Sequence, residues 1–135
     1  MNLPCTDRGD DTRATGRTAL ILEDDEVARE ALTHWLAEEG FAVHTAGDGH
    51  DAADWLARHG ADILIVDRVY PAWEGLGTLQ AVRRLCPDIR ILVTGRGAEL
   101  DDLFLPMARS IGADLVLTGP LTRDALRREI RILLH

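Results

Sequence analysis

The chain has 135 residues, enough for about one domain, and 46% hydrophobic with 28% charged residues is typical of globular rather than disordered proteins. Its 15 cationic residues are all arginine, and 23 Asp and Glu residues leave a formal net charge of -8. The lack of lysine excludes Schiff-base chemistry and the lysine of a phosphate-binding loop. The acidity disfavours binding to nucleic acid or to a membrane surface, because both interactions require a basic face.

Several features predict a cytoplasmic protein. No run approaches the ~18 apolar residues of a membrane span, and the first residues lack the apolar run of a signal peptide. The two cysteines, Cys5 and Cys86, are too few for a disulfide framework and do not have the spacing of a metal site, so we expect reduced thiols. Abundant Ala, Arg and Gly without lysine suggest a bacterial source with a GC-rich genome.

Residues 1–17 carry three acids, three arginines and few apolar side chains, so we expect a flexible N-terminal tail. The net charge then belongs to one folded domain over residues 18–135. There, short apolar runs alternate with amphipathic stretches, which is typical of βα units around a parallel sheet.

Five apolar runs predict strands at 19–22, 41–45, 63–66, 89–93 and 115–117. Apolar residues at helical spacing predict five helices between and after them, through residues 27–36, 52–56, 79–85, 103–111 and 122–134. Gly40 stands where the first helix should end. We therefore expect an α/β fold, a flavodoxin-like doubly wound sheet of five parallel strands in the order 2-1-3-4-5 with five helices.

Ligands of such sheets bind beyond the carboxyl ends of the strands. The residues at those ends are mostly polar: Glu23, Asp24 and Asp25, then Asp67, Thr94, and Thr118-Gly119-Pro120. Helix capping explains Asp25 and Thr122, but it does not explain three consecutive acids. Capping also does not explain Asp67, because residues 68–75 are predicted to form a turn rather than a helix start.

The first and third strands are neighbours in the expected order, so Glu23, Asp24 and Asp67 should lie together. Carboxylates that close repel one another and need a cation or a raised pKa. Oxygen ligands of this kind suit Mg²⁺. An Asp beside Mg²⁺ with a hydroxyl across the pocket, here Thr94, can accept a phosphoryl group.

The chain resembles the receiver domain of two-component response regulators over residues 18–135. Four motifs in order carry the resemblance: ALILEDD at 19–25, Asp67 with Pro71 and Gly75, ILVTG at 91–95, and GAD at 112–114 with Pro120.

The resemblance implies that Asp67 accepts a phosphoryl group from a sensor histidine kinase or a histidine phosphotransfer protein. It also implies an Mg²⁺ ion held by Asp24 directly, by Glu23 through water, by Asp67, and by the backbone carbonyl of Val69. Thr94 would move onto a phosphoryl oxygen as the switch hydroxyl, and Gly95 would leave room for it.

The chain departs from the family pattern at two positions. The active-site lysine is replaced by Gly119, and the aromatic residue that rotates with the switch threonine is replaced by Val116. The missing charge could come from an arginine, a water or a second cation, and Arg68 and Arg96 are the nearest arginines along the sequence.

These features predict a single-domain response regulator that signals through protein contacts and is not an enzyme beyond self-catalysed phosphotransfer and slow autodephosphorylation. Its target would bind the face formed by the fourth helix, fifth strand and fifth helix, and receivers of this kind also form homodimers. The arginines of the last helix form either a solvated face or a contact for an acidic partner: Arg123, Arg127, Arg128 and Arg131.

Three other functions are alternatives to this one. A pseudo-receiver that binds its partner independently of phosphorylation is consistent with Gly119 and Val116. A haloacid-dehalogenase-like phosphatase needs a second acid at the position of Val69. A flavodoxin would place the flavin phosphate against residues 23–26, whose acids repel it.

Overall fold

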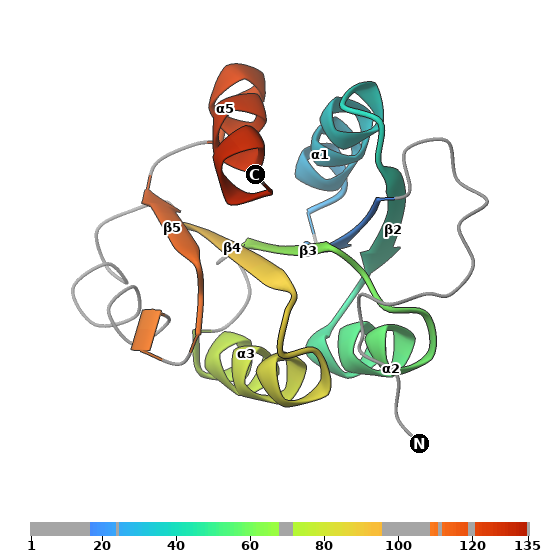
Figure 1. Ribbon diagram of the computed structural model, residues 1–135, viewed down its shortest axis with the longest axis vertical. Coiled ribbons are helices and arrows are strands. Elements are labelled where there is room, and N and C mark those ends of the chain that lie inside the picture. Colours follow the sequence, from blue (N-terminus) through green and yellow to red (C-terminus); the bar gives the residue numbers. More distant parts are fainter. Residues whose placement is uncertain are drawn as a thin grey trace.

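A computed structural model of the chain describes residues 17–23, 25–67, 72–95, 109–110, 112–118 and 121–134, without the side chains of residues 67, 72–76, 95 and 118. The described residues contain one sheet with helices on both of its faces (Figure 1). The strands are β1 (Thr18–Leu22), β2 (Ala42–Ala46), β3 (Ile63–Asp67), β4 (Arg90–Gly95) and β5 (Leu115–Thr118). The helices are α1 (Glu26–Glu38), α2 (Gly49–His59), α3 (Ala72–Leu85) and α5 (Arg123–Leu133).

All strand pairs are parallel and the order is β2-β1-β3-β4-β5, which confirms the predicted doubly wound topology. Four of the five expected helices lie in the described residues, and the predicted helix through 103–111 lies largely outside them. Every helix in the described part of the chain is too short or too polar to span a bilayer.

The two faces of the sheet carry separate apolar clusters, with α1 and α5 on one face and α2 and α3 on the other (Figure 1). Successive residues of a strand point to opposite faces. The α1/α5 cluster contains Ala19, Ile21, Ile63, Ile65 and Leu92 from the strands. The α2/α3 cluster contains Leu20, Leu22, Leu64, Val66, Ile91, Val93 and Val116.

Local signals set several helix ends as predicted. Asp25 is the N-cap of α1 and its Oδ2 accepts a hydrogen bond from the backbone N–H of Ala28 at 2.8 Å. Thr122 caps α5 in the same way, through Ala125. Gly40 follows the end of α1 with φ of 95°, a conformation that glycine adopts without steric cost.

The start of α3 differs from the prediction. The helix begins at Ala72, inside the segment 68–75 that was predicted to be a turn. Gly75 and Gly77 have low helix propensity, but the burial of Leu79 and Val82 in the α2/α3 cluster stabilises the helix as a whole. The helix still starts five residues after Asp67, so Asp67 is not its N-cap.

Cys86, directly after α3, is completely buried and is disulfide-bonded. The expectation of a reduced thiol is therefore wrong for this residue. Sequence spacing is uninformative here, because a disulfide depends on which segments the fold brings together. Cys5 lies outside the described residues.

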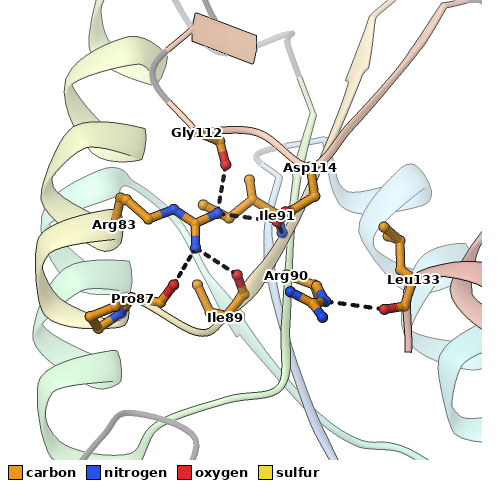
Figure 2. Close-up of polar contacts among 8 residues, drawn as sticks. All are labelled: Arg83, Pro87, Ile89, Arg90, Ile91, Gly112, Asp114 and Leu133. Atoms are coloured by element: carbon orange, nitrogen blue, oxygen red, sulfur yellow. Dashed lines mark hydrogen bonds and ion pairs between the residues drawn. The ribbon is translucent and has the colours of Figure 1, made fainter. Parts of the chain in front are cut away.

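One arginine joins α3 to the segments on either side of β4 (Figure 2). The Arg83 guanidinium donates to the carbonyl oxygens of Pro87 at 2.8 Å, Ile89 at 2.9 Å and Gly112, and contacts Asp114 Oδ2 at 3.1 Å. The same Asp114 oxygen accepts from the backbone N–H of Ile91, at the beginning of β4.

Candidate functional site

The carboxyl ends of β1, β3 and β4 lie side by side at one edge of the sheet. Leu22 pairs with Val66, and Asp67 pairs with Thr94. Glu23 directly follows Leu22 and therefore stands beside Asp67. Neighbouring strands are about 4.8 Å apart, so the backbones at 23, 67 and 94 form a short row across three strands.

Glu23 and Thr94 belong to the α1/α5 face of the sheet. Glu23 has the parity of Ile21, Thr94 has that of Leu92, and position 67 has that of Ile63 and Ile65, all of which belong to the α1/α5 cluster. Glu23 and Thr94 are buried, with 1% and 5% of their surface exposed. A carboxylate and a hydroxyl thus flank position 67 where little water reaches them.

Glu23 and Asp25, two of the three consecutive acids, have different hydrogen-bond partners. Glu23 Oε2 accepts a hydrogen bond from the backbone N–H of Asp25 at 2.9 Å. The Asp25 carboxylate is exposed and caps α1, so capping accounts for this residue. Arg29, at the end of the first turn of α1, donates from Nη1 to the carbonyl oxygen of Glu23 at 3.2 Å.

Several predicted site residues lie outside the described residues: Asp24, Arg68, Val69, Arg96, Gly119 and the side chain of Asp67. Gly95 ends β4 and pairs with Thr118 across the sheet. Val116, which the sequence predicts to replace the family's aromatic residue, is buried in the α2/α3 cluster.

The described residues provide one donor that suits Mg²⁺. The described side chains include no group of three His, Cys, Asp or Glu residues that could hold a metal ion, and they do not include those of Asp24 and Asp67. The Glu23 carboxylate is a hard oxygen donor, buried beside position 67. This chemistry fits Mg²⁺, which prefers carboxylates and water.

Three arginines of α5 contact the acidic residues at the end of α1. The sequence did not predict this contact. Arg127 Nε lies 3.0 Å from Glu39 Oε2, Arg131 lies 3.8 Å from Glu39 Oε1, and Arg123 Nε lies 3.1 Å from Glu38 Oε1. Arg127 is half-buried at this contact, whereas Arg123 and Arg131 remain exposed, as expected for a solvated face. The acidic doublet at the end of the first helix was the available signal for a partner.

The family model for the response regulator receiver domain matches residues 19–131. The chain belongs to this family. The receiver is 32% identical over 118 residues to the sensory transduction protein RegX3 of Mycolicibacterium smegmatis, covering 87% of this chain and 50% of RegX3. It is 35% identical over 116 residues to the transcriptional regulatory protein CpxR of Escherichia coli, covering 86% and 48%. The chain thus spans about half the length of these curated relatives.

Solved structures agree on the fold. A response regulator from Thermotoga maritima superposes with a TM-score of 0.76 at 21% identity, covering 87% of this chain and 97% of that one. The chemotaxis response regulator CheY4 of Vibrio cholerae has the same TM-score at 23% identity, covering 87% and 98%. The chain is therefore a receiver domain of the two-component type, from a family of signalling proteins that interact with histidine kinases or phosphotransfer proteins and generally use Mg²⁺.

Proposed function

We propose that this receiver accepts a phosphoryl group on Asp67 from a histidine kinase or a histidine phosphotransfer protein, and that phosphorylation changes its contacts with a protein partner. The supporting observation is the register of the sheet, which pairs Asp67 with Thr94 and sets the buried Glu23 beside it.

The reaction exchanges one bond to phosphorus for another. A carboxylate oxygen of Asp67 forms a bond to phosphorus while the bond from phosphorus to the donor imidazole nitrogen breaks, and the imidazole keeps that electron pair. Bound Mg²⁺ would shield the negative charge of the transferred group. Asp24, Asp67 and the Val69 carbonyl would hold the ion directly, and Glu23 would hold it through a water molecule.

Thr94 then donates its hydroxyl hydrogen to a phosphoryl oxygen, and Gly95 leaves space for the group because it has no side chain. The modified residue is part of the receiver itself, so each molecule reacts once until water hydrolyses the acyl phosphate. This chemistry makes the receiver a phosphoryl acceptor rather than a turnover enzyme.

The partner surface that we propose includes β5 and α5, which lie next to the end of β4 where Thr94 sits. Leu117 pairs with Thr94, so a shift of Thr94 acts directly on β5. Ile132 of α5 is 64% exposed and offers an apolar contact to a target or to a second copy of the chain.

The alternative function is a pseudo-receiver that binds its partner without phosphorylation. Two features favour it: the chain has no lysine, and Val116 stands where the family has a rotating aromatic residue. The buried valine removes the usual link between the switch threonine and the surface of β5.

Intact-protein mass after incubation with acetyl phosphate, with and without Mg²⁺, separates the two functions. We expect one phosphoryl adduct that requires Mg²⁺ and is lost in Asp67→Asn, because the amide cannot form the acyl phosphate. Asp88→Asn, an exposed acid in the turn before β4, is the matched control and should keep the adduct. A folded receiver that binds Mg²⁺ and gives no adduct would contradict the proposal and favour the pseudo-receiver.

A further inference from the structure

Phosphorylation of Asp67 would replace a carboxylate of charge -1 with an acyl phosphate of charge about -1.5 to -2, in a domain that is already acidic. The charge would appear beside the buried Glu23 carboxylate. No lysine is available anywhere in the chain to contact it. Apart from bound Mg²⁺, the positive charge near a phosphoryl group at this place would have to come from an arginine of the chain.

Arg29 is held at the correct edge of the sheet. Its backbone N–H donates to the Asp25 carbonyl oxygen at 2.9 Å in the first turn of α1, and Asp25 caps that helix. Its Nη1 reaches back to the carbonyl oxygen of Glu23 at 3.2 Å. The guanidinium thus lies against the carboxyl end of β1 and is half-buried.

The position of the strand end brings this guanidinium near position 67. Glu23 and Asp67 stand on neighbouring strands, so the 3.2 Å contact and one strand spacing put Arg29 Nη1 within about 8 Å of the Asp67 backbone. An aspartyl phosphate extends several bonds beyond its own backbone, a length comparable to that gap. Position 67 also has the parity of strand residues that face α1, the helix that carries Arg29.

The chemistry of the side chain suits the role. A guanidinium has five N–H donors in a planar fork that matches the oxygens of a phosphoryl group. Among the described residues, the Glu23 carbonyl oxygen uses one of these donors. The planar guanidinium can also bind an anion at position 67 through its other N–H donors.

We propose that Arg29 contacts the phosphoryl group on Asp67 and supplies the positive charge of the family's active-site lysine, whose position is Gly119 here. The inference rests on the proposed phosphorylation of Asp67. The alternative is a structural role, in which Arg29 only connects α1 to the end of β1 through its hydrogen bond to Glu23.

The test compares the rate of adduct formation with acetyl phosphate and saturating Mg²⁺ in matched variants. Arg29→Gln keeps a hydrogen-bond donor but removes the charge, and we expect about a 10- to 100-fold slower rate. Adding Gly119→Lys to the Arg29→Gln chain should restore most of the rate. Arg58→Gln, which breaks an exposed pair with Asp54 on α2, is the control and should react at the original rate.

A second readout uses Mg²⁺ alone. Loss of a nearby positive charge should raise Mg²⁺ affinity in Arg29→Gln by about two- to fivefold, measured by calorimetry. An unchanged affinity overturns the proposal, because it would mean that the charge of Arg29 does not act at the site.

The remaining outcomes are also decisive. If the unaltered chain forms no adduct, the proposed function fails and the inference fails with it. If the unaltered chain reacts and Arg29→Gln reacts equally fast, the inference alone fails. A slow Arg29→Gln chain that Gly119→Lys does not restore assigns the structural role and also overturns it.

One further measurement does not require an Arg29 variant to fold. Gly119→Lys in the otherwise unaltered chain should accelerate the reaction by less than about threefold, because Arg29 already provides the charge. An acceleration of about tenfold or more, the effect of one charged hydrogen bond, would show that the site lacks a cation and would overturn the inference.

Discussion

Gly49, the first residue of α2, shows how closely two helices approach at a single residue. A Cβ at this position would overlap Thr78 Oγ1 and would lie 3.2 Å from Thr78 Cβ. Thr78 belongs to α3, is buried and has a short branched side chain, so it has little freedom to move away. The contact between α2 and α3 at this point therefore depends on the absence of a side chain.

We expect Gly49→Ala to lower the free energy of unfolding by about 1 to 3 kcal/mol, the usual cost of overpacking. Chemical denaturation measures this value. Gly47→Ala is the matched control, because a Cβ there meets nothing within 4 Å, and it should change stability by less than about 0.5 kcal/mol. Equal effects of the two substitutions would mean that α2 and α3 move apart at no cost.

At the scale of whole elements, arginines rather than apolar contacts alone hold helices to their neighbours. Arg127 and Arg131 bind Glu39, which links α5 to the end of α1. Arg83 links α3 to the residues before β4 and before β5 (Figure 2). The carbonyl oxygens that Arg83 satisfies stand where the chain leaves a helix or enters a strand, so they have no partner of their own in a regular hydrogen-bond ladder.

Arg83→Met keeps the apolar length of the side chain and removes the donors. We expect it to cost about 2 to 3 kcal/mol of unfolding free energy, since hydrogen bonds from a partly buried guanidinium are lost together. Arg84→Met, the exposed neighbour on the same helix, should stay within about 0.5 kcal/mol. The prediction would be contradicted if Arg83→Met and Arg84→Met unfolded at the same denaturant concentration.

Across the whole molecule, stability should depend on pH through a stack of three rings between β2 and α2. His44 lies parallel to Trp55 with ring centroids 4.5 Å apart, and His59 lies on Trp55 at 4.8 Å. Burial, and then the charge of His59, lower the pKa of His44 below its usual 6.5. Because His44 remains largely exposed to solvent, the effect is small.

The direction follows from proton linkage. A folded-state pKa below 6.5 means that the unfolded chain binds a proton more readily, so the contribution of neutral His44 is present above about pH 6.5 and is lost as the pH falls toward the folded value. We expect the difference in Tm between the unaltered chain and His44→Gln to shrink from pH 8 to pH 5.5. Parallel curves for the two chains would show that His44 does not titrate differently on folding.

The amino-acid sequence by itself determined the five apolar runs, the caps at Asp25 and Thr122, and the acids that follow the first and third strands. These features act between residues a few positions apart, through strand alternation, helical spacing and capping, so they can be recognised along the chain. Together they were enough to indicate the receiver fold and the edge of the sheet where Glu23, Asp67 and Thr94 come together.

Tertiary structure decided the features that depend on distant segments. The α3 helix includes residues expected in a turn because its later residues pack into the α2/α3 cluster, and Cys86 has a disulfide that its spacing did not predict. Arg127 and Glu39 are 88 positions apart and meet only because α1 and α5 cover the same face of the sheet.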